Sequence, residues 1–339
     1  MSQNTPKDSD QLPSVSVQNP SGDEKAKELL TVFRQKFEAA KKEKFVFLLI
    51  GRTGVGKSST INTLMAKEVA KVGDWVPTTL MVESYDSDAL GIKFTVIDTP
   101  GLCDELEEVG NDERYLELIR EKVTKFDCMW FVTRLNETRI TSDEKRGIKL
   151  ITESFGQKVW EHAVIVFTFA CSVNLLKYQV ALEKRAELIR AEISKYADER
   201  VADSVPAVAV DNESRTTPDG NEWLGELYTK VFTRMTDRGL MSFFAATAHR
   251  LNPPKKSKGK GGDSLPGAAP SSSGAGAASE SKINLTSSQA KEIKKRIDAS
   301  IIPTAAAVGA SIGFVFGPAG AVIGGSIGAA IGLVAWFWD

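Results

Sequence analysis

Short apolar runs alternate with longer amphipathic stretches through most of the chain. The apolar runs lie at 45–50, 92–97, 128–133, 163–168 and 205–210. Because each run is apolar throughout, it is typical of a strand buried on both faces of a mostly parallel sheet. The stretches between them, chiefly 111–126, 142–155 and 176–197, have the spacing of amphipathic helices. This alternation predicts an α/β domain with three layers, in which helices cover both faces of the sheet.

The residues before the first strand fall into two parts. Residues 1–22 are polar and contain prolines and aspartates without an apolar run, so we interpret them as a disordered leader and not as a signal or transit peptide. Residues 24–43 carry apolar residues at helical spacing, among them Leu29, Phe33 and Phe37. We expect this helix to pack on the domain, which gives a predicted domain of 23–250. A partner-binding helix is the alternative.

The C-terminal part changes composition twice. Residues 251–290 begin with prolines and lysines and continue with Gly, Ser, Ala and Pro, which predicts a flexible linker. Residues 291–339 are predicted to form a membrane anchor. Within them, 301–338 contain no charged residue and exceed the roughly 20 apolar residues that cross a bilayer.

Glycines recur at every fourth position of this tail, from Gly309 to Gly317 and from Gly320 to Gly332, as in closely packed membrane helices. One span near 319–338 and a hairpin turning at Pro318 are both open. A soluble pair of Ala/Gly helices is a third interpretation. Basic residues at 291–296 flank the tail on its N-terminal side, which predicts that the large domain faces the cytosol.

The net charge and the cysteines argue against several kinds of partner and site. The formal net charge of -1 provides no overall attraction for nucleic acid, so we expect no nucleic-acid partner. The three cysteines lie far apart and lack the spacing of metal ligands. A disulfide framework or a zinc site is therefore not expected, and a reducing compartment fits best.

The first chemical motif directly follows the strand predicted at 45–50. Residues 51–58 read GRTGVGKS and match GxxxxGK[ST] between a predicted strand and a predicted helix. In this motif, successive backbone N–H groups form a concave anion site at the start of a helix. We expect Lys57 to reach the β- and γ-phosphates of a nucleotide and Ser58 to bind Mg²⁺. The other expected phosphate-binding residues are Gly51, Arg52, Thr53, Gly54, Val55, Gly56 and Ser59.

A second motif, DTPG at 98–101, ends the strand predicted at 92–97. We expect Asp98 to hold Mg²⁺, through water, and the N–H of Gly101 to reach the γ-phosphate. This motif downstream of a phosphate-binding loop indicates the GTPase branch. Between the two motifs, Thr78 and Thr79 are candidates for switch I, with Thr79 as the predicted metal ligand. Switch II is expected from Gly101 to about residue 112.

Five segments together resemble a known group of proteins. They are GRTGVGKSSTIN at 51–62, IDTPGL at 97–102, FVTRLNETRIT at 131–141, ITESFGQKVWEHAVIVFT at 151–168 and VPAVAVDNESR at 205–215. The chain resembles the septin-related GTPases, which include the Toc import receptors of the plastid outer envelope and the immunity-associated AIG-type proteins. The resemblance covers about 40–238. It implies a Mg²⁺-dependent GTP/GDP switch that forms a homodimer or heterodimer across its nucleotide face.

Recognition of the base departs from the usual pattern. No aspartate of a TKxD motif follows the strand predicted at 163–168, and Phe169 stands where the Toc relatives have a histidine. Phe169 can stack on a base but cannot hydrogen-bond to it. By resemblance, Asp211 and Asn212 would read guanine. A loop stabilised by an Asx-turn is the alternative for these two residues.

Hydrolysis is expected to be slow. Leu102 follows DTPG, where many GTPases place a glutamine that orients water. Arg139 lies in the segment that resembles the Toc dimer contact, and it could stabilise the transferring phosphate of a partner's nucleotide as an arginine finger does. Bracing the interface is an equally open role for Arg139. Arg134 and Arg52 are weaker candidates.

We therefore predict a membrane-anchored, slow GTPase switch, with Lys57 and Arg139 as catalytic residues. By resemblance, the partner could be a preprotein in an organelle import complex, and the membrane a plastid outer envelope or another organelle outer membrane. The alternative is a membrane scaffold that binds GTP and hardly hydrolyses it. A membrane-disrupting tail with a regulatory domain is a third possibility.

Overall fold

The structure is a computed structural model that describes residues 31–32, 35–70, 83–99, 111–254 and 281–305. The strands are β1 (Phe45–Ile50), β2 (Glu83–Ala89), β3 (Ile92–Thr99), β4 (Cys128–Arg134), β5 (Ala163–Thr168), β6 (Ala207–Ala209), β7 (Leu251–Asn252) and β8 (Ile283–Asn284). The α-helices are α2 (Lys57–Met65), α3 (Asn111–Lys122), α4 (Ser142–Phe155), α5 (Leu175–Ile193), α6 (Glu199–Ser204), α7 (Trp223–Arg234), α8 (Asp237–Thr247) and α9 (Ser287–Ala305).

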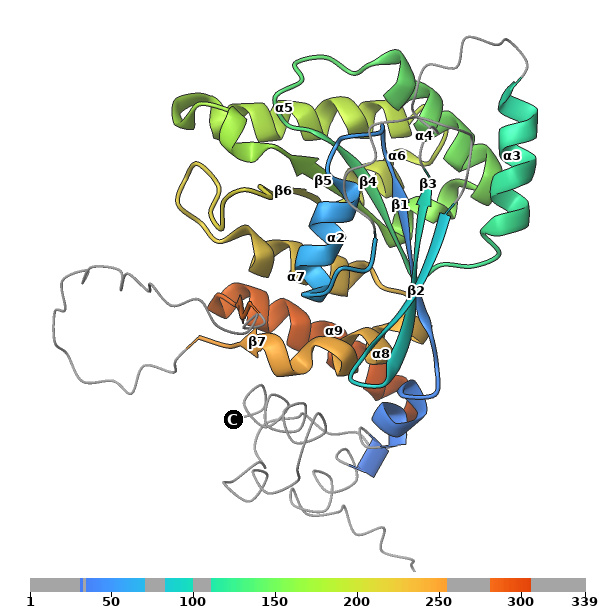
Figure 1. Cartoon of the computed structure of the whole chain (residues 1–339), viewed down its shortest axis with the longest axis vertical. Helices are drawn as coiled ribbons and strands as arrows, with labels where there is room; N and C mark the ends of the chain where they lie inside the picture. Colours follow the sequence, from blue (N-terminus) through green and yellow to red (C-terminus); the bar gives the residue numbers. More distant parts are fainter. Residues whose placement is uncertain (1–30, 33–34, 71–82, 100–110, 255–280, 306–339) are drawn as a thin grey trace, which may run out of the picture.

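The centre of the molecule is a six-stranded sheet with the order β2-β3-β1-β4-β5-β6 (Figure 1). β1 pairs in parallel with β3 and β4, and the parallel pairing continues through β5 to β6. β2 runs antiparallel to β3 at the edge of the sheet. The predicted α/β fold with a mostly parallel sheet is confirmed. β2 was not predicted, because its sequence ESYDSDA has no apolar run.

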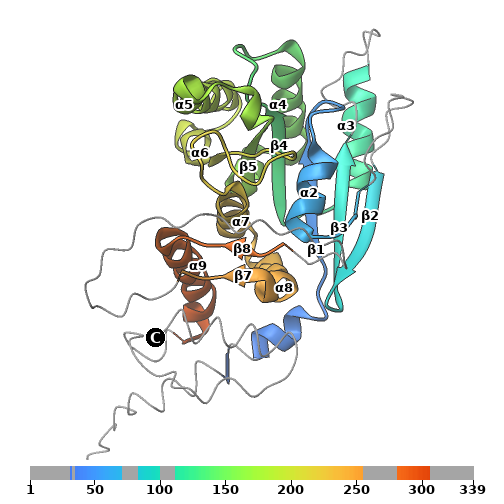
Figure 2. The ribbon, with the colours of Figure 1, turned by 60° about the vertical axis from the view of Figure 1, so that its left-hand side comes forward.

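Helices cover both faces of the sheet, as Figures 1 and 2 show. All six side chains of β1 are buried, and they alternate between two cores. Phe45, Phe47 and Leu49 belong to the core shared with α2, α7, α8 and α9. Val46, Leu48 and Ile50 belong to the core shared with α3, α4, α5 and α6. The continuous apolar run thus serves two layers, as expected for a central parallel strand.

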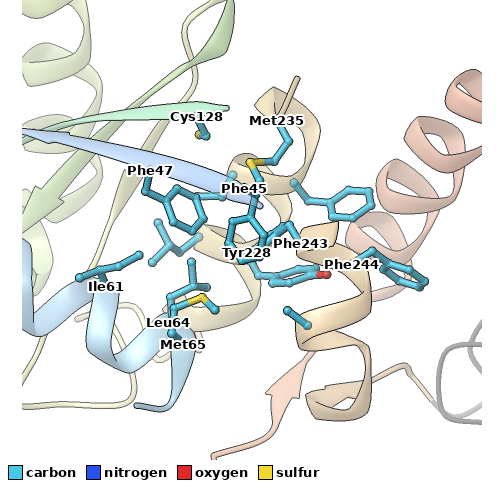
Figure 3. Close-up of a cluster of buried hydrophobic side chains, with 14 of the residues drawn as sticks. Phe45, Phe47, Ile61, Leu64, Met65, Cys128, Tyr228, Met235, Phe243 and Phe244 are labelled. Atoms are coloured by element: carbon cyan, nitrogen blue, oxygen red, sulfur yellow. The ribbon is translucent and has the colours of Figure 1, made fainter. Parts of the chain in front are cut away.

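A cluster of aromatic rings connects α7 and α8 to the start of the sheet (Figure 3). The ring centroid of Phe243 on α8 lies 5.7 Å from that of Phe45 and 5.6 Å from that of Phe47. Tyr228 on α7 stacks on Phe243 at 5.3 Å. Ile61 and Leu64 of α2 are fully buried in the same core. The helix that follows the phosphate-binding motif therefore packs into a core that contacts between aromatic rings stabilise.

The residues after the predicted linker return to the domain. β8 pairs with β7 in parallel, and α9 buries Ile293 and Ile297 in the core beside α7 (Figure 2). Arg250 is almost fully buried; its guanidinium donates to the carbonyls of Leu64 and Thr63, at the end of α2, and to Ser281 at 2.9 Å. Residues 281–297 thus belong to the packed domain, which differs from the predicted boundary at 291.

Several predictions concern residues outside the described ranges. They are the leader 1–22, most of the predicted linker, both switch segments and the apolar stretch 306–339. Within the described ranges, no helix combines the length and the apolar character needed to cross a membrane.

Candidate functional site

The predicted site residues gather at the carboxyl edge of the sheet. Gly51 follows β1, Asp98 lies near the end of β3, Arg134 ends β4, Phe169 follows β5, and Asp211 lies just beyond β6. From β1 the chain passes first to β2 and β3 on one side and then to β4 on the other. In open α/β sheets, ligands bind outside the carboxyl ends of the strands at such a switch of direction.

The phosphate-binding loop 51–58 is shaped by its glycines. Gly54 and Gly56 have φ values of 75° and 93°, a region that residues with a Cβ atom rarely adopt. A Cβ atom on Gly51 would overlap the backbone carbonyl of Val132 on β4, and one on Gly56 would lie 2.9 Å from Nδ2 of Asn212. The loop is thus pressed against its neighbours in a way that only glycine permits, and α2 begins at Lys57, immediately after Gly56.

The side chain of Lys57 is held by hydrogen bonds to the backbone of the phosphate-binding loop. Its Nζ donates to the carbonyls of Gly51 at 2.8 Å and of Arg52 at 3.1 Å. The same Nζ lies 3.5 Å from Oδ1 of Asp98. Both side chains are largely buried, so the structure places a cation and a carboxylate at the centre of the predicted phosphate and Mg²⁺ site. In water-excluded surroundings these charges act strongly on a phosphate or a metal ion.

The donor set at this point suits a hard cation. Ser58 lies in the first turn of α2, and Asp98 lies two strands away in sequence but beside Lys57 in space. A hydroxyl and a carboxylate are oxygen donors of the kind that Mg²⁺ prefers, together with phosphate oxygens and water. Ser58 and Asp98 therefore fit the predicted role of metal ligands. Thr78, Thr79 and Gly101, which would complete the site, lie outside the described residues.

Neighbouring strands support the loop. Oγ1 of Thr168, at the end of β5, donates to the carbonyl of Val55 at 2.6 Å. Nη2 of Arg134, at the end of β4, donates to the carbonyl of Gly54 at 3.3 Å. Thr53 and Gly54 are exposed at the tip of the loop, Ser59 is partly exposed, and Val55 is buried. The tip is thus open to a ligand while the base of the loop is fixed.

On the side of the predicted base, Phe169 adopts a left-handed backbone conformation with φ 56°. The guanidinium carbon of Arg134 lies 4.4 Å from the centre of its ring, a distance typical of a cation–π interaction. One face of the ring thus carries an arginine that also contacts the phosphate-binding loop. Arg134, a weak candidate from the sequence, therefore links the two halves of the site.

Asp211 and Asn212 make contacts within the fold. Asp211 accepts hydrogen bonds from the backbone N–H groups of Cys171 at 2.8 Å and of Glu213 and Ser214 at 3.0 Å, the pattern of the Asx-turn alternative. Asn212 shares hydrogen bonds with Oγ1 of Thr60 at 3.1–3.2 Å, in the first turns of α2. Both residues are thus brought to the phosphate-binding loop, and their contact with a base stays a prediction.

The exposed Cys171 lies at this same edge. Partial burial of the sulfur and the negative charge of Asp211 raise the pKa of the Cys171 thiol above its ordinary value. The thiolate is therefore disfavoured at neutral pH, and the pKa of this thiol reports on the charge of Asp211.

Arg139 and Arg52 have different surroundings. The side chain of Arg139 is exposed, on the loop between β4 and α4. Arg52 pairs with Glu137 and lies 3.9 Å from Asp143, so its guanidinium is turned toward this loop. Its expected part in phosphate binding would come from its backbone.

Arg185 was not among the predicted site residues. This arginine is 2% exposed on α5 and contacts the same loop. It lies on the helix face that also buries Tyr178, Ala186 and Ile189. A charged residue within an apolar stripe was the signal that could have identified it.

A phosphate-binding loop at the carboxyl end of the central strand, beside the carboxylate of β3, defines a P-loop G domain. Within that class, the chain belongs to the AIG1 family, which matches residues 46–232. The resemblance seen in the motifs is thereby confirmed.

Three relatives and one solved structure illustrate the similarity. The chain is 29% identical to Translocase of chloroplast 101 of Physcomitrium patens over 202 residues, which are 55% of this chain and 22% of the relative. It is 28% identical to Translocase of chloroplast 33 of Arabidopsis thaliana over 230 residues, 58% of this chain and 76% of the relative. It is 35% identical to GTP-binding protein A of Dictyostelium discoideum over 127 residues, 37% of this chain and 28% of the relative.

The crystal structure of Toc33 from Arabidopsis thaliana in complex with GDP and Mg²⁺ is similar with 27% identity and a TM-score of 0.48, covering 62% of this chain and 93% of that one. The chain spans only about a fifth of the length of the first relatives that it matches, 22% and 20%.

Proposed function

We propose that this chain is a GTPase that binds GTP and GDP with Mg²⁺, hydrolyses GTP slowly and acts as a nucleotide-dependent switch on a membrane. The observation that carries the proposal is the convergence of Lys57, Asp98 and the glycine-shaped loop at one point. There the backbone N–H groups, an ammonium and a divalent ion would grip the terminal phosphates. Guanine is favoured because the chain belongs to the AIG1 family and is similar to a GTP-binding protein.

The switch would work through the segments that follow the two motifs. In G domains the γ-phosphate and its Mg²⁺ order the switch loops, and hydrolysis releases them. Thr78, Thr79 and Gly101 are the residues that we assign to this step. Leu102 cannot orient water. Fast turnover would therefore need a catalytic group from outside the chain, either Arg139 of a second copy or a group of another protein.

The place of action is proposed from the tail and from the relatives. The charge-free stretch 301–338 would enter the membrane as a span or a hairpin, with the G domain in the cytosol. Relatives named as chloroplast translocases support a receptor at a plastid or other organelle outer membrane, with preproteins or import components as partners. The identity of the cargo is proposed from the relatives and not from the geometry of the site.

A second candidate function is a nucleotide-dependent membrane scaffold with negligible hydrolysis. It is favoured by Leu102, by the missing TKxD motif and by the use of Asp211 within an Asx-turn. A turnover rate that stays negligible at every protein concentration would support the scaffold over the switch.

Calorimetry with Mg²⁺ and the nucleotides GTP, GDP and ATP tests the proposed function. We expect the guanine nucleotides to bind more tightly than ATP. In Lys57→Ala the affinity for GTP should fall about 100-fold, because a charge-assisted hydrogen bond to phosphate is lost. Lys67→Ala is the matched control, since Lys67 is exposed just beyond α2 and pairs with Asp88. If the unaltered chain binds neither GTP nor GDP, the proposal is wrong. If ATP binds equally well, the assignment of guanine is wrong.

The membrane part has its own test. A fluorescent fusion that ends at residue 300 should leave the membrane fraction, whereas the full chain should remain in it after a salt wash. The truncation keeps Ile293 and Ile297, which pack on the domain. Retention of the truncated chain on membranes would contradict the anchor.

A further inference from the structure

One buried guanidinium contacts three successive parts of the chain beside the phosphate-binding loop. Nη1 of Arg185 donates to the carbonyl of Arg139 at 3.0 Å, and Nη2 donates to Oγ1 of Thr133 at 3.1 Å. The same Nη2 pairs with the carboxylate of Glu144 and lies 3.4 Å from Oε2 of Glu137. Arg185 therefore joins the end of β4, the loop 135–141 and the first turn of α4.

Glu144 fixes the far end of this loop. Its Oε2 accepts the N–H of Thr141 at 2.8 Å, while Oγ1 of Thr141 accepts the N–H of Glu144 at 3.2 Å. This is a capping box, and its carboxylate is also the main partner of the buried Arg185. Because the ion pair is shielded from water, its geometry is held firmly, and loss of either partner would leave an unpaired buried charge.

Glu137 connects the loop to the nucleotide site. Its carboxylate is shared: Oε2 faces Arg185, and Oε1 accepts from Nη2 of Arg52. The carbonyl of Arg52 in turn accepts Nζ of Lys57 at 3.1 Å. The pairing of Arg52 with Glu137 thus fastens the loop to the phosphate-binding loop. Arg134, the last residue of β4, adds a second contact at Gly54 directly before the loop begins.

The result is a rigid backbone that carries an exposed arginine. The backbone of Arg139 is held by a buried group, while its side chain points to solvent. A group that must reach a phosphate outside its own chain needs this combination, because misplacement by about 1 Å can lower a rate 100-fold.

We propose that Arg185 and Glu137 are positioning residues that hold the loop 135–141 on the phosphate-binding loop and so set the place from which Arg139 acts. This inference rests on the proposed GTPase function and on the role of Arg139 within it. In this proposal neither Arg185 nor Glu137 binds the nucleotide. They act through Arg139, and Arg52 is the contact through which the loop follows the phosphate site.

The test is single-turnover hydrolysis of GTP by the full chain over a range of protein concentrations. Glu137→Gln is the main variant, because the amide is isosteric and the side chain of Glu137 is 21% exposed, so the fold should be kept. We expect the concentration-dependent part of the rate to fall about tenfold, with the Kd for GTP and the unfolding midpoint unchanged. Glu153→Gln is the control, since Glu153 is exposed on α4 and pairs only loosely with Lys149, at 3.9 Å.

A second comparison separates positioning from general support of the fold. In the Arg139→Ala background, Glu137→Gln should lower the rate no further, because the residue through which it acts is gone. Arg185→Lys keeps the charge but loses the fork of donors, so it should show the same dependence on Arg139.

Three results would count against the inference. Equal losses from Glu137→Gln with and without Arg139 would overturn it, as would a Glu137→Gln rate equal to that of the unaltered chain. A rate of the unaltered chain that does not rise with concentration would also overturn it, while leaving GTP binding in place. Absence of GTP binding would instead overturn the proposed function itself.

Discussion

The phosphate half of the candidate site and its base half are built from different parts of the chain. At the predicted phosphate position, the structure places one continuous loop of backbone groups, 51–58, with the side chain of Lys57 hydrogen-bonded to the carbonyls of Gly51 and Arg52. At the predicted base position, Phe169 and Asp211 follow two different strands. Phe169 already contacts Arg134, and Asp211 already accepts three backbone N–H groups. The predicted grip on phosphate would therefore be local and generic, whereas the predicted choice of base would depend on side chains that already have other partners.

This difference suggests how such a site can change. Backbone N–H groups bind any polyphosphate, so we expect the affinity of the phosphate half to depend on its glycines and on Lys57 and not on the base. The base half can exchange residues, as at Phe169, provided that the internal hydrogen bonds survive. Three experiments test this contrast.

The largest effect is expected at Gly51. In Gly51→Ala the added Cβ would overlap the carbonyl of Val132, so the loop must shift. The free energy of unfolding should fall by about 1–3 kcal/mol, and GTP binding should be lost. Urea denaturation and calorimetry measure the two effects. Gly91→Ala is the control: its Cβ would meet nothing within 4 Å, so it should bear only the strain of its φ angle and bind GTP normally. Normal GTP binding by Gly51→Ala would show that close backbone approach is not required.

An intermediate effect is expected at Asp211. Asp211→Asn replaces an oxygen that accepts backbone N–H groups, so the free energy of unfolding should fall by about 1–3 kcal/mol. The preference for GTP over ATP should fall about tenfold, since an amide cannot accept both donors of guanine. Thermal unfolding and calorimetry with both nucleotides report these changes. Asp203→Asn, on the exposed side of α6, should change neither. A loss of stability with an unchanged preference would show that Asp211 serves only the Asx-turn.

The smallest effect is expected at Cys171. Its pKa lies above the ordinary value because of partial burial and the charge of Asp211. Only the thiolate reacts, so alkylation should be slow at pH 7 and accelerate as the pH rises through the raised pKa. In Asp211→Asn the pKa should fall, and alkylation at pH 8 should become faster. Iodoacetamide labelling of a Cys103→Ser chain, followed by mass spectrometry, gives the rate; the buried Cys128 should stay unlabelled. Equal rates with and without Asp211→Asn would contradict the link.

The sequence predicted most of the fold because its signals are local. The apolar runs identified β1, β4 and β5 closely, and GRTGVGKS placed the phosphate-binding loop between β1 and α2. β2 was not predicted, because an edge strand with polar side chains has no apolar run. The apolar run 205–210 is longer than β6. Buried loop residues are as apolar as buried strand residues, so the apolar pattern alone does not show where the strand ends.

The support of the site could not be predicted in the same way. The pairing of Arg52 with Glu137, and the contacts of Arg185 with Glu144 and Arg139, join residues from different elements. Apart from Arg185, which lies within the apolar stripe of α5, a charged residue at any of these positions looks like a solvated surface residue until the packing is known. Asn212 likewise meets Thr60 of α2 only because β6 ends beside it.

The direct pairing of β7 with β8 has a mechanical consequence. Leu251 is opposite Ile283 and Asn252 is opposite Asn284, so the predicted linker leaves the domain and rejoins it at one place. Its many residues then add nothing to the distance between the G domain and the tail. The chain instead reaches the tail through α9, 19 residues long and thus about 28 Å, which packs against α7. In an anchored chain, the G domain would therefore be joined to the tail through a helix packed on the domain and not through the length of the predicted linker.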